Sequence, residues 1–181
     1  MQVISRTEDS PLQFAAFKNH LRIYHDNDDA QIYQSLRAAQ DSWDEETKRP
    51  IRTTTYKYES QSIPHGYCFG AGPVQSITSV TYNDADTKAD VTVDASNYRI
   101  TYTGALPKLQ FINDIQAANY NARWWEVTFT ARGETTDDVA RAVFMLGSTF
   151  YDERNTLAPV QLRSVAVGWA TITQRYRWPA I

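Results

Sequence analysis

The sequence predicts an α+β protein in which an N-terminal helical hairpin and a late helix pack with an antiparallel β-sheet. Two changes in the spacing of apolar residues predict this class. Apolar residues recur every three or four positions before residue 51, alternate with polar residues over 51–132, and return to helical spacing after 136. Turn-forming residues separate the alternating segments by hairpin-length gaps, which favours antiparallel pairing. A length of 181 residues fits one domain with a small appendage.

Three helices are expected, at about 11–23, 28–47 and 136–154. Ser10 followed by Pro11 is typical of a helix start, and Asp28 is well placed to cap the second helix. Thr135 to Asp138 has the pattern of a capping box for the third. The link between the first two helices is short and polar, so they should form an antiparallel hairpin.

The β-rich region is expected over 51–132, with four or five strands in an antiparallel sheet or a small open barrel. Its clearest alternations fall in four segments: Thr54–Tyr58, Val74–Tyr82, Tyr98–Tyr102 and Trp125–Phe129. With the helices, these segments define one predicted domain over 1–154.

Residues 155–181 are predicted to form an extended C-terminal arm. Their apolar residues show no clean helical period, and their three arginines stand without any acidic residue. The arm therefore carries a formal charge of +3, whereas 1–154 has 15 basic and 21 acidic residues, a formal −6. An arm rich in aromatic residues lacks the composition of a soluble disordered tail, so we expect it to become ordered only against a partner. Its predicted interface residues are Arg163, Trp169, Arg175, Tyr176, Arg177 and Trp178.

Composition excludes several classes of protein. The single cysteine, Cys68, excludes an intrachain disulfide and a multi-cysteine metal site. No apolar run reaches membrane-spanning length, and the first residues lack the features of a signal peptide, so neither export nor membrane insertion is expected. An acidic body disfavours tight binding to a phosphate backbone. The basic arm could meet either a nucleic acid or an acidic protein.

The groups that could carry chemistry favour structural roles. The possible metal ligands are His20, His25, Asp26, Asp28 and Asp29. Counting from Asp26, they lack the glycine and glutamate of a calcium loop, and the acids also suit a helix–helix turn. His65 and Cys68 are close in sequence, which is poor evidence for a catalytic pair.

A second acidic group is best interpreted as turn residues; it consists of Asp84, Asp86, Asp90 and Asp94. Glycine loops that cradle phosphates and serine elbows are absent from the sequence. We therefore predict no catalytic residues, no metal and no cofactor. Two alternatives stay open: a small binding protein, for example for nucleic acid, and a small cytosolic enzyme.

Several short sequence segments, in the same order along the chain, resemble those of the head–tail connector (adaptor) proteins of tailed bacteriophages and gene-transfer particles. They are Lys18–Ile23, the acidic turn Asp26–Asp29, Pro73–Tyr82, Val127–Gly133 and Phe150–Arg154. The resemblance covers about Leu12 to Arg154.

The resemblance implies a structural virion protein without catalytic activity. It implies a ring of identical subunits, often twelve, that docks on the portal, extends the DNA channel and provides the attachment platform for the next tail or neck protein. DNA would pass through without sequence-specific binding, and no membrane is involved. The location would be the neck of the virion, after synthesis and assembly in the host cytoplasm. The C-terminal arm would then clamp the portal. If the chain is instead a small binding protein other than a connector, the resemblance implies a tail or neck assembly factor.

Overall fold

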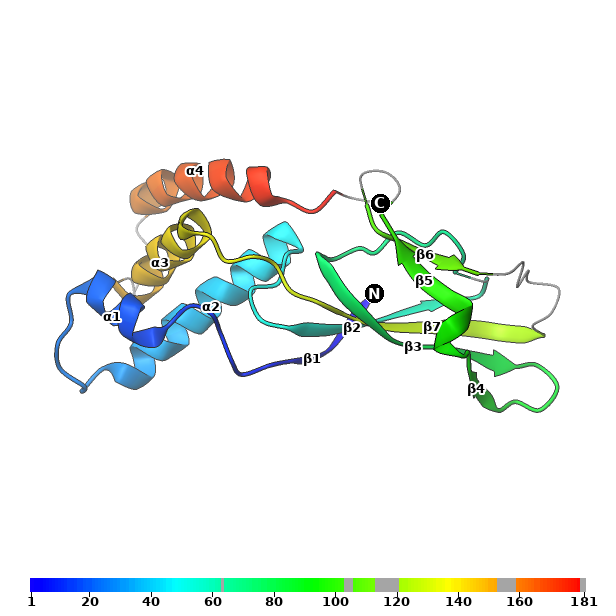
Figure 1. The fold of residues 1–181 in the computed structure, drawn as a ribbon. Helices are drawn as coiled ribbons and strands as arrows, with labels where there is room; N and C mark the ends of the chain where they lie inside the picture. The colour runs from blue at the N-terminus through cyan, green and yellow to red at the C-terminus, as the bar shows by residue number, and fades with distance from the viewer. Residues whose placement is uncertain (63, 103–105, 113–120, 153–158, 180–181) are drawn as a thin grey trace. The chain divides into compact units, whose positions relative to one another are not determined.

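The computed structural model describes residues 1–62, 64–102, 106–112, 121–152 and 159–179, with side chains omitted for 159–167. The chain divides into two units. The sheet unit consists mainly of Met1–Thr7 and Thr53–Arg132, and the helical unit consists of Glu8–Arg52 and Gly133–Trp178. Figure 1 shows the elements of both units, which are described separately below.

The helical unit contains four α-helices in the described part of the chain. They are α1 (Phe14–Leu21), α2 (Asp29–Thr47), α3 (Asp137–Asp152) and α4 (Pro159–Tyr176). Helix α2 packs against α3, and α4 packs against both. The shared core is made of side chains at helical spacing, including Phe17, Ile32, Leu36, Trp43 and Val143. A Cβ on Gly147 would come within 2.8 Å of the Phe17 ring, so only glycine allows this close approach of α3.

The turn between α1 and α2 is closed by its own backbone and by one lysine. Arg22 adopts a left-handed conformation at the end of α1, and the N–H of Ile23 donates to the carbonyl of Lys18. The ammonium group of Lys18 lies 2.6 Å from a carboxylate oxygen of Asp26 and 2.6 Å from one of Asp29. The acidic turn is therefore held in place by a lysine from the preceding helix.

The sheet unit is built on an antiparallel sheet in the order β1-β2-β7-β3-β4. Its strands are β1 (Gln2–Arg6), β2 (Thr54–Ser60), β7 (Ala122–Ala131), β3 (Val74–Asp84) and β4 (Asp90–Thr92). A short 3-10 helix, Ala95–Asn97, leads into a separate ribbon of β5 (Tyr98–Thr101) and β6 (Lys108–Phe111). Three irregularities interrupt the pairing of β3 with β7.

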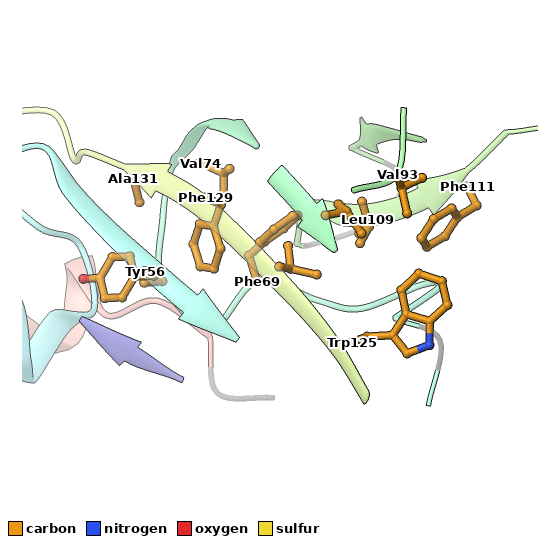
Figure 2. Close-up of a cluster of buried hydrophobic side chains, with 12 residues drawn as sticks. Tyr56, Phe69, Val74, Val93, Leu109, Phe111, Trp125, Phe129 and Ala131 are labelled. Atoms are coloured by element: carbon orange, nitrogen blue, oxygen red, sulfur yellow. The ribbon is translucent and has the colours of Figure 1, made fainter. Parts of the chain in front are cut away.

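One face of this sheet carries the core of the unit (Figure 2). In β7 the buried residues alternate with less buried ones, as the period of two requires. Phe129 stacks on Tyr56 at 5.4 Å between ring centroids and meets Phe69 edge-on at 4.8 Å. Phe111 from β6 meets Trp125 edge-on at 5.8 Å, so the ribbon packs into the same cluster. The opposite face is polar, with Lys57 Nζ 2.6 Å from Glu126 Oε2.

The predicted α+β class is confirmed, with small changes at the element ends. Helix α1 covers Phe14–Leu21 rather than 11–23, and α3 starts after Thr136, whose hydroxyl accepts a hydrogen bond from the N–H of Val139. Strand β1 was not predicted, because its five residues at the edge of the sheet are too few to show a clear alternation.

The prediction of an extended arm is wrong for Pro159–Tyr176, which form helix α4. Trp169, Ile172 and Tyr176 are spaced by three and four residues, so they lie on one face of this helix. All three pack against the core of the helical unit. The β-branched residues and Gly168 in the same segment disfavour a helix locally, but the packing of this face outweighs that preference.

Candidate functional site

The aromatic residues predicted as a docking interface have contacts inside the helical unit. Trp43 of α2 meets Trp169 edge-on at 5.7 Å, and its ring lies 5.6 Å from that of Tyr176. After α4, the N–H of Trp178 donates to the carbonyl of Thr47 at 2.6 Å. The guanidinium of Arg49 lies over the Trp178 ring at 5.2 Å. These rings therefore pack against residues of their own chain, whereas the sequence analysis predicted an extended arm that becomes ordered only against a partner.

The arginines of the same segment point into solvent. Arg175 and Arg177 keep 73% and 62% of their side-chain surface exposed. Arg175 Nη1 lies 3.9 Å from Asp138 Oδ2, and Arg177 Nη2 lies 3.6 Å from Glu46 Oε1. Exposed pairs of this kind contribute about 0–1 kcal/mol each. Both guanidinium groups can therefore leave these ion pairs for an acidic partner at little cost in free energy. The side chain of Arg163, the third predicted arginine, lies outside the described residues.

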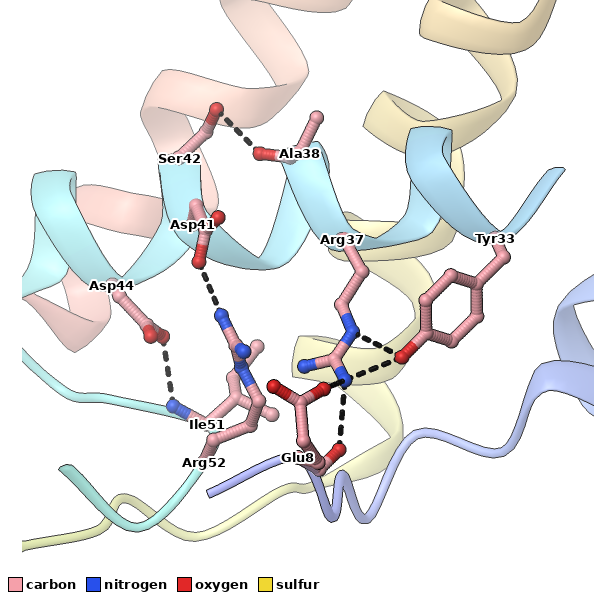
Figure 3. Close-up of polar contacts among 9 residues, drawn as sticks. All are labelled: Glu8, Tyr33, Arg37, Ala38, Asp41, Ser42, Asp44, Ile51 and Arg52. Atoms are coloured by element: carbon pink, nitrogen blue, oxygen red, sulfur yellow. Dashed lines mark hydrogen bonds and ion pairs between the residues drawn. The ribbon is translucent and has the colours of Figure 1, made fainter. Parts of the chain in front are cut away.

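Polar residues along one side of α2 bind two other segments of the chain, the one before α1 and the one that follows α2 (Figure 3). Arg37 binds the Glu8 carboxylate, the Glu8 carbonyl at 2.9 Å and the Tyr33 hydroxyl. Asp41 forms an ion pair with Arg52. Asp44 accepts a hydrogen bond of 2.8 Å from the N–H of Ile51.

Sequence reasoning missed this set, whose signal is polar residues three or four positions apart beside the apolar stripe of α2. Arg37 and Arg52 have only 15% and 7% of their side-chain surface exposed. Removing either acidic partner would leave a nearly buried charge, which makes these contacts structural.

The three aspartates among the possible metal ligands of the α1–α2 turn have other partners, and the His20 ring lies 5.7 Å from that of Phe144. The hydrogen bond with Asp26, followed by that with Asp29, raises the pKa of Lys18, and the same Lys18 contact lowers the pKa of Asp26. The Tyr151 hydroxyl donates to Asp28 at 2.6 Å. Within the described ranges, no group of three or more His, Cys, Asp or Glu residues is arranged to hold a metal ion.

His65 and Cys68 each have a separate backbone partner. The N–H of Phe111 donates to His65 Nδ1 at 3.4 Å, and the Cys68 thiol donates to the carbonyl of Gly66 at 3.8 Å. The His65 contact ties the connection between β2 and β3 to the β6 strand, as does an isolated antiparallel bridge between Cys68 and Lys108, whereas the Cys68 thiol contact lies within the connection. The structure therefore gives both residues a role in holding a loop.

The acidic residues between β3 and the 3-10 helix serve turns. Asp84 accepts hydrogen bonds from the N–H groups of Asp86 and Thr87 and from the Thr87 hydroxyl, at 2.8–3.0 Å. The contacts with Thr87 contribute most to lowering the pKa of Asp84. Asp94 caps the 3-10 helix by accepting from the N–H of Ser96. The hydrogen bond from the Ser96 side chain, followed by that from its N–H, lowers the pKa of Asp94. Asp90 accepts from the Asn83 amide at 2.8 Å.

No helix in the described part of the chain is long and apolar enough to cross a membrane.

Tyr67 has a pKa raised to about 12, mainly because burial disfavours the charged phenolate. Tyr67 stacks on Tyr58 at 3.9 Å, which is consistent with a packing role.

The sequence matches no family model and no curated protein. It is similar to chains in three solved structures of gene transfer agent (GTA) particles. They are the neck of the empty particle computed with C6 symmetry, the neck of the native particle computed with C12 symmetry, and the virion of the native particle. In each case the identity is 22%, the TM-score is 0.73, and the match covers 100% of this chain and 97% of the other. The fold of this protein is therefore shared, over its whole length, with a chain of these particles.

Proposed function

We propose that this protein is a structural component of a virion neck, namely a subunit of a ring-forming head–tail connector. The observation that carries the proposal is the full-length similarity in fold to chains of the gene transfer agent neck. A match that includes both units and leaves only 3% of the other chain uncovered favours the same architecture in the assembled particle. In the proposed role the ring docks on the portal, extends the DNA channel and offers a platform to the next tail or neck protein.

The charge distribution is consistent with this role. The body of the chain is acidic, with a formal −6 over 1–154, so a channel made from it would repel the DNA backbone and let it slide. The solvent-exposed guanidinium groups of Arg175 and Arg177 offer a basic patch for an acidic surface of the portal. We propose this patch as the docking contact, in place of the whole predicted arm.

The proposal includes the absence of catalytic activity. The three aspartates of the α1–α2 turn, His65 in the β2–β3 connection and Asp84 at the β3–β4 turn make structural contacts in the described chain. We propose a homo-oligomeric ring of twelve subunits located at the neck of the virion, because the similar chains come from neck structures computed with C6 and C12 symmetry.

The direct test is the assembly state of the purified full chain. Sedimentation velocity should show one closed species of about twelve subunits, and negative-stain electron microscopy should show rings with a central channel. Addition of purified portal should then give a complex of two stacked rings. A protein that stays monomeric at every concentration and with portal, or that forms open filaments, would contradict the connector function.

A further inference from the structure

The chain passes between its two units at four places, which follow Thr7, Arg52, Arg132 and Trp178. The last three of these passages reach the helical unit at one place, the C-terminal end of helix α2. We call this place the junction, and it consists of five residues of the helical unit: Thr47, Arg49, Pro50, Gly133 and Trp178.

Close contacts join the three chain segments of the junction. The N–H of Trp178 donates to the carbonyl of Thr47 at 2.6 Å, and the N–H of Gly133 donates to the carbonyl of Pro50 at 2.7 Å. A Cβ on Gly133 would lie 3.3 Å from the Cβ of Arg49, so the lack of a side chain allows a close approach. The guanidinium of Arg49 lies over the Trp178 ring at 5.2 Å. The pair Arg49–Pro50 is therefore in contact with both Gly133 and Trp178.

Trp178 is buried, but it stands apart from the apolar core of the helical unit. Its exposed fraction is 8%, whereas the core that the described side chains form includes the other large rings of α2 and α4, namely Trp43, Trp169 and Tyr176. Its hydrogen bond to Thr47 and its cation–π contact with Arg49 are interactions that each contribute modestly. A residue held in this way can leave its site while the core stays closed.

We propose that Trp178 is a latch on the junction. In the closed state its N–H and its ring hold Thr47 and Arg49, and the contact of Arg49 with Gly133 extends this support to the returning chain. In the open state the chain passages at the junction lose that support. Closure also fixes the preceding residue, Arg177, whose guanidinium is exposed. In this last respect the inference rests on the proposed function, because it makes the closed latch the form that docks on an acidic surface.

Amide hydrogen exchange of the full-length chain, followed by mass spectrometry, tests the latch without any partner. Trp178→Ala removes the ring, Trp178→Phe keeps an aromatic ring, and Trp124→Ala removes an exposed tryptophan of the sheet unit as the control. In Trp178→Ala the segments that contain Ile51 and Gly133 should exchange about tenfold faster than in the wild type, because local opening becomes more frequent. Trp178→Phe should give a smaller increase. Strand β7 and helix α3 should exchange at the wild-type rate in all three variants.

A second measurement, binding of each variant to purified portal at low salt, tests the link to docking. Faster exchange confined to the junction, together with weaker portal binding of Trp178→Ala, would support the inference. An equal increase in every segment would overturn it, because Trp178 would then only stabilise the whole fold. Wild-type exchange at the junction, or wild-type portal binding by Trp178→Ala, would overturn it as well. A wild type that does not bind portal would instead overturn the proposed docking contact, since the exchange rates are measured without portal.

Discussion

At the scale of single residues, Asp84 shows how a turn that is visible in the sequence becomes a measurable dependence on pH. Its carboxylate accepts three hydrogen bonds at the β3–β4 turn, and these bonds lower its pKa. Since the folded state favours the ionised form, the stabilisation is complete above the ordinary aspartate pKa of about 3.9 and is lost as the pH falls through the lowered pKa.

We therefore predict that Asp84→Asn lowers the Tm at pH 7 and that the difference from the wild type closes below about pH 3.9. Thermal unfolding followed by circular dichroism between pH 7 and pH 2.5 checks this. Asp86→Asn is the control, because it removes a charge from the same turn and its carboxylate makes no hydrogen bond within the described residues. A difference that persists unchanged at low pH would show that the charge of Asp84 is not what holds the turn.

Residues such as Asp84 could be predicted from the sequence, whereas Gln40 could not. An aspartate in an Asn-Asp-Ala-Asp stretch between two alternating segments has a local reason to be a turn residue. Gln40 is one of three glutamines on α2, and it is the one that is buried, at 1% exposure. Burial of a polar group depends on contacts distant in sequence, so the sequence alone does not distinguish Gln40 from the other two.

At the scale of elements, helix α4 depends on its contacts with α2. Trp169 and Tyr176 both meet the ring of Trp43, which is 1% exposed. Isolated helices of this length are marginal in water, so most of the stability of α4 comes from this packing.

We predict that Trp169→Ala destabilises the protein by about 2–3 kcal/mol, less than the 3–5 kcal/mol typical of a fully buried tryptophan because Trp169 is only partly buried. Urea denaturation gives the free energy of unfolding directly. Trp124→Ala is the matched control, since Trp124 is 41% exposed, and it should change the stability by less than about 1 kcal/mol. Equal losses in the two variants would mean that α4 is not held by the aromatic contact.

The first three helices and the strands β2, β3, β5 and β7 followed from the spacing of apolar residues, whereas β1, β4, β6 and the C-terminal helix did not. In long periodic segments such as β7 and α2, the spacing of apolar residues predicts the secondary structure directly, because one face of each element is consistently buried. In α4 the residues that pack, Trp169, Ile172 and Tyr176, stand among Val165 and Val167, which blur the helical period. Tertiary contact with Trp43, rather than local preference, decides the conformation there.

At the scale of the whole molecule, the acidic body and the basic C-terminal segment are separate in sequence, and the structure separates two roles within that segment. Trp169 and Tyr176 belong to the core of the helical unit, whereas Arg175 and Arg177 stay exposed. Deleting 155–181 is therefore a poor test of docking, because it would uncover Trp43 and destabilise the fold. Substitution of the two arginines leaves the packing intact.

We predict that the double variant Arg175→Gln, Arg177→Gln folds normally, with a change in stability within about 1 kcal/mol, because both ion pairs are exposed. Its rings should bind purified portal more weakly than the wild type at low salt and about equally at 0.5 M salt, because screening removes the advantage of the charges. Sedimentation or interferometry over a salt series measures this. The control is Lys88→Gln with Arg123→Gln, which removes two exposed positive charges from the sheet unit and should keep the wild-type salt dependence. If the two double variants behave alike, net charge rather than the C-terminal patch governs docking, and the assignment of Arg175 and Arg177 to the portal contact is wrong.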